Sequence, residues 1–390
     1  MNILTLTTSY PTTNNRASGI FVKRFLENFD GSVVHHVLSP RPSKSNEFFV
    51  GEINGRISPC VYFLSKYEKI FHGGGGAPAA ISKNPLYTLL IPLVFLSMLY
   101  KGLRLASGVD VVHGHWSFCG FIACAVGLFS GKPVVVTLHG QDVNRSEESL
   151  VLRGLLFLTV HLSDQVVTVS QGMCDFLHDK FPKYKGKITF ISNGVTKNFF
   201  EICRVPYQRA GPVNILAVSS LIRSKGLDVI IRAFSCLSND NSVLLTIVGE
   251  GDELTYLNSL VRSLGLANSV VFKGAVEPTS MPLIYADADI FVSASEAEGR
   301  PSVLLEAMAA SLPVILSDIP AHRELLQVDG RSFFFKSGDA AGLSVHLKAM
   351  LGDPSQGRRQ GLENKKYLVD SGLSWPETVK KYMLVYKNLM

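Results

Sequence analysis

The chain has 390 residues, of which 46% are hydrophobic and 18% charged. These values indicate a soluble globular protein that is too long for one ordinary core, so we expect two domains. The formal net charge of +6 is uneven: residues 1–200 carry 19 Lys and Arg against 12 Asp and Glu (+7), and residues 201–390 carry 19 against 20 (−1). We therefore expect the N-terminal half to meet an anionic partner, and none of these features calls for nucleic acid.

Cysteine usage and the N-terminal residues bear on the compartment. The cysteines show no CxxC and no zinc-like spacing, and "MNILTLTTSYP" has no charged region before an apolar stretch. Both facts predict a reducing, cytoplasmic setting. The six cysteines are Cys60, Cys119, Cys124, Cys174, Cys203 and Cys236.

Short Val- and Ile-rich runs alternate with longer helical patterns through the first half. This rhythm is typical of βαβ units and a parallel sheet covered on both faces. The predicted strands are 2–9, 32–39, 110–116, 132–140, 164–171 and 188–194.

The most apolar segment is 85–105. It offers 16 residues before Lys101, interrupted by Thr88, Pro92 and Ser97, which is short of the ~20 apolar residues of a membrane-spanning helix. A core helix and a helix lying on a membrane surface both remain open. The glycine run before it, Gly73–Gly76, lacks the GKS/T of a P-loop and suits a flexible connector or a close approach to a ligand.

The strand rhythm restarts after 197–212, a polar stretch with two prolines. The second set of predicted strands is 213–221, 242–251, 269–276, 287–295 and 312–318. We therefore predict an α/β protein with two doubly wound domains, 1–200 and 201–375, and an amphipathic C-terminal helix over 376–390. Ligands of such sheets bind beyond the carboxyl ends of the strands, and two facing domains would form a cleft.

The segment "EAEGRPSVLLEAMAAS" (296–311) follows one of these strands. Pro301 suits the first turn of a helix, whose free N–H groups at Ser302 and Val303 would form an anion site. Glu298 and Glu306 bracket this helix start. Two solvated carboxylates, or the acid and base of an inverting glycoside hydrolase, are alternatives, but a hydrolase has no use for an anion site between them.

A second helix start lies in "LIRSKGLDVIIRAF" (221–234). Lys225 and Gly226 follow a predicted strand, where the ammonium could neutralise a diphosphate as a point charge. An ordinary surface lysine is the alternative. Together with the glutamates, this arrangement favours a nucleotide sugar: hydroxyls on Glu298, diphosphate on the helix start and ribose on Glu306.

These motifs resemble the GT-B-fold retaining glycosyltransferases of family 4 (group 1), of the bacterial surface-polysaccharide type. The matching stretches are "EGRPSVLLEAMAASLPVILSD", "SKGLDVIIRAF", "IVGEGDE", "VVFKGAV", "TLHGQDV", "VVTVSQGM" and "ISNGV". The resemblance implies two Rossmann-like domains and a C-terminal helix that crosses back over the first domain.

By this resemblance, the C-terminal domain would bind the donor. Lys225 and Glu298 would act in catalysis, together with His139 in the N-terminal domain. The remaining donor-side residues would be Arg223, Gly249, Glu250, Gly274, Val276, Gly299, Arg300, Pro301, Ser302, Val303 and Glu306. Ser220 departs from the family, which usually has an arginine there, and Arg223 could supply the missing charge.

In the N-terminal domain, the resemblance implies that Gly19 belongs to a mobile glycine loop near the phosphates. His139 would lie near the transferred sugar, with Asp142 beside it. We expect His115 to end a strand where it touches the acceptor, and His113 to be internal.

We expect neither metal nor cofactor. Asp287 and Asp289 form a "DAD" that precedes its strand, unlike the metal-binding DxD of the GT-A class. The resemblance implies hexosyl transfer from a UDP- or GDP-sugar, with retained anomeric configuration, to a saccharide acceptor that is possibly polyprenyl-diphosphate-linked. The enzyme would be peripheral on the inner face of the cell membrane and serve lipopolysaccharide or exopolysaccharide synthesis.

Three rival functions stay open. A nucleotide-sugar 2-epimerase uses the same fold and needs no acceptor, and a degenerate transferase could bind the donor without turnover. A nicotinamide dehydrogenase also has Rossmann-like halves, but the first strand runs into "TSYPTTNNRASG" without GxGxxG.

Overall fold

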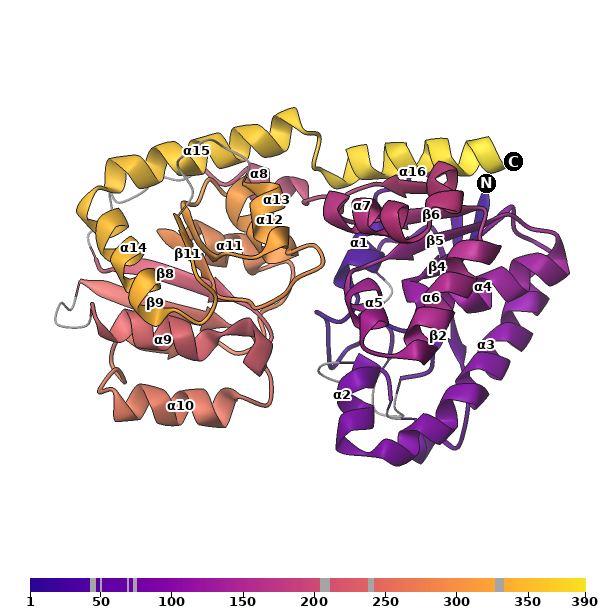
Figure 1. The fold of residues 1–390 in the computed structure, drawn as a ribbon, viewed down its shortest axis with the longest axis horizontal. Coiled ribbons are helices and arrows are strands. Elements are labelled where there is room, and N and C mark those ends of the chain that lie inside the picture. Colours follow the sequence, from indigo (N-terminus) through magenta and orange to yellow (C-terminus); the bar gives the residue numbers. More distant parts are fainter. Residues whose placement is uncertain are drawn as a thin grey trace. The chain divides into compact units, whose positions relative to one another are not determined.

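The computed structural model describes residues 1–42, 47–49, 51–68, 70–72, 76–203, 211–237, 242–326 and 333–390. The chain forms two compact units: Met1–Asn193 with Trp375–Met390, the N-terminal unit, and Gly194–Ser374, the C-terminal unit (Figure 1). The predicted linker 197–212 lies partly outside the described residues, as do the glycines at 73–75.

The N-terminal unit is built on a parallel sheet of seven strands. In spatial order these are β3 (Gly55–Cys60), β2 (Val34–Pro40), β1 (Asn2–Leu6), β4 (Val111–His115), β5 (Val134–Leu138), β6 (Gln165–Thr168) and β7 (Ile188–Phe190). Strand side chains alternate between the two faces, so Leu4 and Leu6 join one core cluster and Ile3 joins the other.

Helices cover both faces of this sheet. The Leu4 face packs against α3 (Ile91–Ala106), α4 (Trp116–Ser130), α6 (Leu150–Leu162) and α7 (Gln171–Lys180), and the Ile3 face against α1 (Ile20–Glu27) and α16 (Trp375–Leu389). The shorter elements are η1 (Ser65–Tyr67), α2 (Gly76–Lys83), η2 (Pro85–Leu90), α5 (Gln141–Asn144), η3 (Arg145–Glu147) and η4 (Pro182–Lys187).

The C-terminal unit repeats this plan with a six-stranded parallel sheet. Its strands, in spatial order, are β10 (Val270–Phe272), β9 (Val243–Val248), β8 (Val213–Val218), β11 (Ile290–Ser293), β12 (Val314–Ser317) and β13 (Phe333–Phe335). Its helices are α8 (Lys197–Phe200), η5 (Arg223–Lys225), α9 (Leu227–Ser235), α10 (Leu254–Ser263), α11 (Met281–Ala286), α12 (Ser302–Ala309), α13 (Pro320–Leu325), α14 (Ala340–Gly352) and α15 (Pro354–Asp370).

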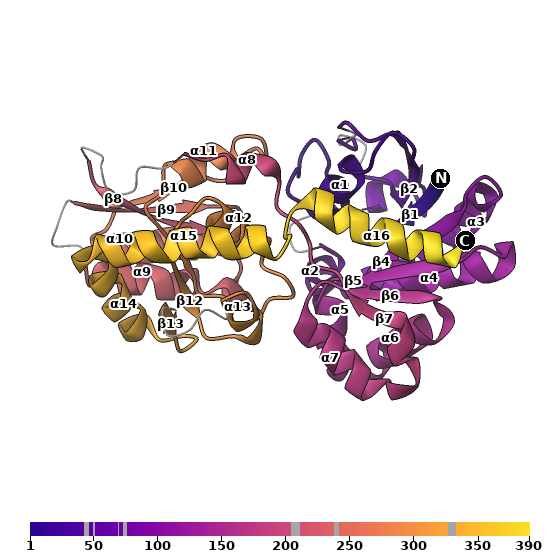
Figure 2. The same ribbon diagram turned by 90° about the horizontal axis from the view of Figure 1, so that it is seen from above.

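The C-terminal helix α16 packs on the N-terminal sheet, as the family resemblance implies (Figure 2). The Tyr386 hydroxyl lies 2.7 Å from His113 Nδ1 on β4, and Thr378 Oγ1 donates to Ser192 O at 2.9 Å. Its buried face includes Trp375, which begins the helix, and Val379. The last helix therefore completes the core of the first unit.

Each of the eleven predicted strands has a counterpart, and two strands, β3 and β13, have no prediction. Both are edge strands. Along β3 most residues are exposed or half-buried, so the segment has no continuous apolar run, and β13 has only three residues. An exposed edge strand such as β3 lacks the burial that makes central parallel strands recognisable in sequence.

The apolar segment 85–105 forms η2 and α3 without a break. Together Pro85–Ala106 is 22 residues long, with a mean hydropathy of 1.7 over its most apolar window, of which only 17% is buried. By length and composition alone this helix could cross a membrane. One side of the helix lies in the core, where Val94, Met98 and Ala106 are buried, and the other side is exposed. The core-helix interpretation therefore describes the inner side of this segment and not the outer side.

Candidate active site

A close approach of two loops forms the centre of the site in the C-terminal unit. After β8, the short helix η5 ends at Gly226, which has φ 61° and caps α9. A Cβ at this position would lie 2.5 Å from the Ala294 carbonyl oxygen, just beyond β11. Glycine therefore lets the loop after β8 lie against the loop after β11.

This approach places Lys225 against Glu298. The ammonium lies 2.5 Å from Glu298 Oε1, and the Ser295 hydroxyl donates to the same oxygen at 2.8 Å. The two charged side chains keep 20% and 16% of their surface exposed. The lysine and glutamate that the sequence singled out are therefore one ion pair, and both side chains remain partly exposed.

Helix α12 begins four residues after Glu298 in the chain. Pro301 is the N-cap residue, one position before the first helical residue, Ser302. No group within the described ranges accepts the N–H of Ser302 or Val303, so the positive end of the helix dipole is available to an anion. Glu306 lies one turn further on and is 5% exposed, and its ribose contact stays a prediction.

The loops after β8, β9 and β10 are tied together at the same edge of the sheet. Gly249 has φ 137°, and a Cβ there would lie 1.9 Å from Ser219 O. Its N–H donates to Gly274 O at 2.9 Å, and Leu221 N donates to Glu250 O at 2.9 Å. Three of the predicted donor-side positions, Gly249, Glu250 and Gly274, therefore lie in one connected group.

The two arginines predicted here have different surroundings. Arg300 Nη1 lies 2.8 Å from Glu324 Oε1, and its side chain is only 4% exposed. Burial lowers the pKa of Arg300, and the Glu324 carboxylate acts in the opposite direction. Arg300 thus braces its loop and presents little surface to a ligand, whereas Arg223 is exposed and makes no ion pair with any residue that the structure describes.

His322 was missed in the sequence. It lies on α13, directly after β12, and is completely buried, with Nδ1 2.8 Å from Ser317 O. Its Nε2 has no hydrogen-bond partner among the described residues. Burial lowers the pKa of His322, while Glu298 raises it and Lys225 lowers it, so both charges lie within electrostatic reach. His322 follows the predicted strand 312–318, so the rule that ligands bind beyond the carboxyl ends of strands would have identified it as a candidate.

In the N-terminal unit, alternation along β4 directs His113 and His115 to the face covered by α1 and α16. His113 has no exposed surface, as expected for an internal residue, and its Nε2 lies 2.8 Å from Thr137 Oγ1. Burial lowers the pKa of His113 well below its usual value. This histidine therefore anchors the last helix in neutral form.

His115 is also buried, with 2% exposure, and its Nδ1 lies 3.0 Å from Nε2 of His139. Burial lowers the pKa of His115 to about 3 and that of His139 well below its usual value, so both rings are neutral at pH 7. The His139 ring packs against Phe21 and Trp116. His115 contacts the predicted catalytic histidine, and its own acceptor contact stays a prediction.

Asp142 organises the loop that carries His139. Its Oδ1 accepts the N–H groups of His139, Gly140 and Val143, and its Oδ2 accepts that of Ser117 at 3.1 Å. Burial raises the pKa of Asp142 to about 6, although these hydrogen bonds act in the opposite direction. The carboxylate is occupied by backbone groups, which favours a structural role over a contact with the sugar.

The two halves of the chain match two adjacent family models. Residues 31–199 match Glycosyltransferase Family 4, and residues 204–367 match Glycosyl transferases group 1. The chain belongs to this glycosyltransferase family.

Similar proteins agree with this assignment. An uncharacterized glycosyltransferase (MJ1607) of Methanocaldococcus jannaschii is 29% identical over 298 residues, covering 72% of this chain and 76% of the relative. A glycogen synthase of Mycobacterium tuberculosis is 28% identical over 290 residues, covering 71% and 68%. Sucrose-phosphate synthase (tll1590) from Thermosynechococcus elongatus shares the fold, with a TM-score of 0.80 at 15% identity over 100% of this chain and 99% of that one.

Gly19 of the glycosyltransferase precedes α1 and has φ 64°. A Cβ there would lie 2.3 Å from Ser9 O, and the hydroxyls of Ser9 and Ser18 lie 2.7 Å apart. Only glycine permits this close return of the chain to the segment after β1. The predicted phosphate contact of Gly19 stays a prediction.

The predicted donor-side residue Val276, and Asp289, which was not expected to bind a metal, both have structural contacts. Val276 packs against the core of the C-terminal unit. Asp289, from the "DAD" stretch, is 5% exposed and accepts the Asn214 N–H at 2.9 Å. Over the parts of the chain that are described, no group of three or more His, Cys, Asp or Glu is arranged to hold a metal.

Proposed function

We propose that this glycosyltransferase moves a hexose from a UDP- or GDP-sugar to a saccharide acceptor with retention of the anomeric configuration. The Lys225–Glu298 pair carries the proposal, because it sets a cation and a hydrogen-bond acceptor for hydroxyls side by side. The free N–H groups of Ser302 and Val303 offer the diphosphate a further anchor. In this assignment Lys225 and the helix start bind phosphate, and Glu298 binds hexose hydroxyls.

The proposed chemistry needs no protein nucleophile. The bond between the anomeric carbon and the leaving phosphate oxygen breaks, and the acceptor hydroxyl forms its bond to the same face of that carbon. The acceptor proton passes to an oxygen of the departing phosphate. Negative charge then builds on the nucleoside diphosphate, where the ammonium of Lys225 stabilises it.

We assign the acceptor to the N-terminal unit. His139 is held neutral by burial, so its ring can exchange a hydrogen bond with a sugar hydroxyl without carrying charge. A lipid-linked acceptor, and an enzyme on the inner face of the cell membrane, complete the proposal. Gly19, Arg223 and Glu306 are proposed as secondary contacts to phosphate or ribose.

Two similar proteins support the substrate classes. A structure of Anabaena Alr3699/HepE in complex with UDP and glucose shares the fold, with a TM-score of 0.76 at 16% identity over 100% of both chains. An alpha-monoglucosyldiacylglycerol synthase of Streptococcus pneumoniae, whose name states a lipid product, is 24% identical over 290 residues, covering 67% of this chain and 64% of the relative.

A donor screen tests the proposal. We expect one nucleotide sugar, at about 100 times its dissociation constant, to stabilise the protein by about 2.7 kcal/mol in a thermal-shift assay. With a saccharide acceptor, that donor should release nucleoside diphosphate, and the product should keep the anomeric configuration by NMR. An epimer formed from donor alone would indicate a 2-epimerase, and donor binding without turnover would indicate a non-catalytic protein.

A further inference from the structure

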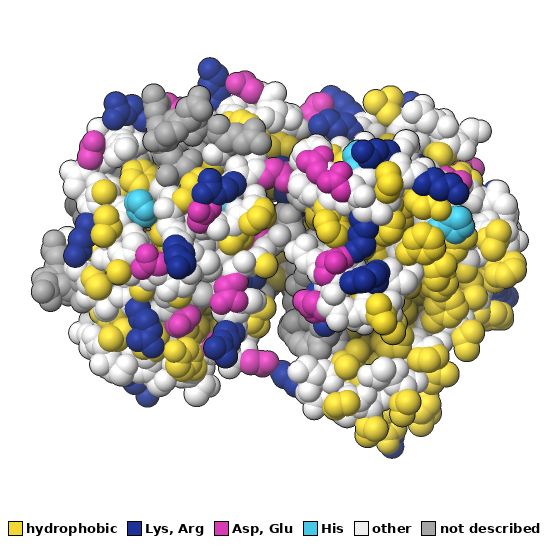
Figure 3. All heavy atoms as spheres, viewed as in Figure 1, with side chains coloured by type: hydrophobic (Ala, Val, Ile, Leu, Met, Phe, Trp, Pro, Cys, Tyr) yellow, Lys and Arg dark blue, Asp and Glu magenta, His cyan; other side chains and the backbone are white. Residues whose placement is uncertain are grey.

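The N-terminal unit carries an exposed apolar surface on η2 and α3, which we call the apolar platform (Figure 3). It is made by side chains that are 37–72% exposed and spaced three or four residues apart, which puts them on one side of the helix. They are Leu86, Leu89, Leu93, Leu96 and Tyr100. Soluble monomers rarely expose so many large apolar side chains together, so we expect this surface to contact a partner.

The opposite side of α3 is fixed to the protein. Val94 and Met98 are fully buried in the core beneath it. Gly102 lets the helix approach α4 so closely that a Cβ there would lie 2.8 Å from Val126 Cγ2. A helix seated in this way presents one face outward, and this favours a helix that lies along a surface over one that spans a bilayer.

A loop that also exposes apolar side chains belongs to the platform. Val61, Phe63, Leu64 and Tyr67 are 41–62% exposed. The loop is joined to α3 by Ser97, whose hydroxyl donates to Val61 O, and by Lys101, whose ammonium donates to Pro59 O at 2.6 Å. Loop and helix therefore form one continuous surface.

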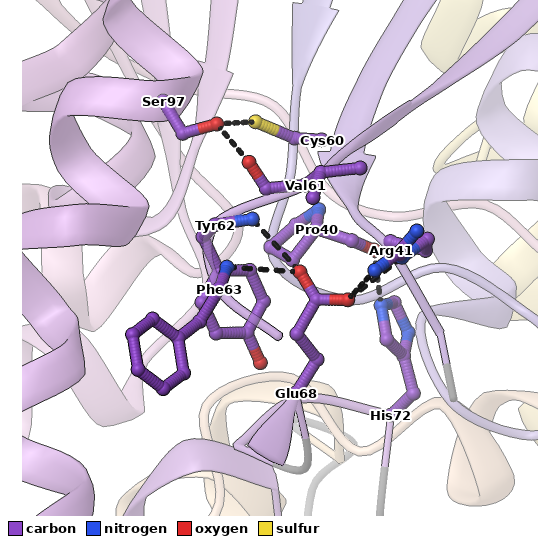
Figure 4. A network of polar contacts seen from close by, with 9 residues as sticks. All are labelled: Pro40, Arg41, Cys60, Val61, Tyr62, Phe63, Glu68, His72 and Ser97. Carbon is purple, nitrogen blue, oxygen red and sulfur yellow. Dashed lines mark hydrogen bonds and ion pairs between the residues drawn. The ribbon is translucent and has the colours of Figure 1, made fainter. Parts of the chain in front are cut away.

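A buried charge network holds this loop in shape (Figure 4). Glu68 is 2% exposed; its Oε1 accepts the N–H groups of Tyr62 and Phe63, at 2.8 and 3.2 Å. The guanidinium of Arg41 lies against Oε2, at 2.6 Å from Nη2 and 2.7 Å from Nε. The aromatic and aliphatic side chains of the loop are thus displayed by a rigid backbone instead of collapsing onto the core.

The exposed charges of the segments that form the platform have one sign. Residues 69–109 contain no Asp or Glu, and Glu68 just before them is buried and neutralised by Arg41. Lys66 on the loop, Lys83 before η2 and Arg104 near the end of α3 are exposed cations. An apolar centre with a purely cationic rim complements an anionic lipid surface.

We propose that the apolar platform inserts into the interface of an anionic lipid bilayer, with α3 parallel to the membrane plane. This inference rests on the proposed function in that a lipid-linked acceptor lies in the same membrane. The exposed apolar residues Leu128 and Phe129 of α4, the helix that packs against α3, extend the apolar surface.

Vesicle flotation with the full-length protein tests the platform. We expect binding to phosphatidylcholine vesicles containing about one third phosphatidylglycerol, and much weaker binding to phosphatidylcholine alone. The double variant Leu89→Glu/Leu96→Glu should lose at least tenfold in partitioning. Lys83→Gln and Arg104→Gln should each lose about fivefold at low salt, and less at high salt.

The matched control is Leu283→Glu/Val345→Glu, which adds the same charges at equally exposed apolar positions of the C-terminal unit and should bind vesicles as the wild type does. Unchanged binding by the Leu89/Leu96 variant would overturn the proposal. So would a dimer of the wild type, seen by sedimentation without vesicles, that this variant dissociates, because a second copy would then be the occupant. Release of nucleoside diphosphate from donor without vesicles should be equal in all these proteins, and its absence would contradict the proposed function and not the platform.

Discussion

Both units place polar groups at the carboxyl ends of their parallel strands, yet the chemistry of these groups differs. In the C-terminal unit the central pair, Lys225 and Glu298, is ionic and partly exposed. In the N-terminal unit His115 and His139 form a neutral pair, held neutral by burial. One parallel-sheet plan therefore supports two kinds of site.

The difference indicates that the two sites suit different chemical groups of the substrates. A charged pair beside a free helix start suits a diphosphate, whose charge changes during the reaction. A neutral pair suits hydroxyl groups, which need hydrogen bonds and no counter-charge. The following predictions test whether the two sites depend on different physical supports, beginning with the largest effect.

Deleting 375–390 should disrupt the N-terminal unit and spare the C-terminal one. The deletion removes four buried side chains, Trp375, Val379, Tyr382 and Tyr386, and at roughly 1.5–3 kcal/mol each the loss equals the stability of a typical domain. Calorimetry should show that the unfolding transition of the N-terminal unit is lost. The transition of the C-terminal unit should remain, and nucleoside diphosphate should still raise its midpoint temperature. A wild-type melting curve would contradict this account of α16.

Lys225→Ala should lower hexosyl transfer by about 10²–10³-fold, because the leaving diphosphate loses its cation. Initial rates at saturating donor measure this loss. Arg300→Lys is a useful contrast, since Arg300 is buried on Glu324 and its variant should act mainly through stability. Equal transfer by Lys225→Ala and wild type would remove Lys225 from the site.

His115 should make the stability of the N-terminal unit depend on pH. Its folded-state pKa of about 3 lies below the unfolded value of about 6.5, so its contribution is fully present above pH 6.5 and is lost as pH falls toward 3. Between pH 7 and 5 this one residue should account for about 2 kcal/mol.

Urea unfolding of wild type and His115→Gln at both pH values measures this difference. The variant should be less stable at pH 7 and should lose about 2 kcal/mol less than wild type on acidification. Identical pH dependence in the two proteins would mean that His115 takes up its proton in the folded state.

The smallest expected effect concerns Arg223. It is exposed, so Arg223→Ala should weaken nucleoside diphosphate binding by only about two- to fivefold, and less at high salt. Ser220→Arg restores the residue usual in the family and should strengthen binding. Calorimetric titration of both variants decides whether Arg223 or position 220 faces the phosphates.

Sequence patterns predicted those parts of the fold that have a strong local signal in the sequence. The central strands are apolar runs, and the helix starts at Gly226 and Pro301 each follow a strand after a short loop, so their positions could be predicted. The edge strand β3 could not, because its residues form no such run. Strand β13 is a run of only three phenylalanines, which is too short to distinguish a strand from a buried helix by pattern.

At the site, residue type and position predicted that Lys225 and Glu298 matter, but not that they contact each other. That contact joins residues 73 positions apart in the chain and depends on the approach of Gly226 to Ala294. Likewise the burial of Arg300 and the backbone bonds of Asp142 depend on tertiary packing. Charged residues that support a loop and those that bind a ligand look alike in sequence.

The most direct test of the account is to titrate nucleoside diphosphate and the matching nucleotide sugar into wild type, Lys225→Ala and Glu298→Gln. The account predicts that Lys225→Ala weakens both ligands, while Glu298→Gln keeps the affinity for the diphosphate within about threefold and loses the additional affinity due to the hexose, with transfer reduced by about 10²-fold. Equal affinities for both ligands in all three proteins would contradict the assignment of the donor to this pair.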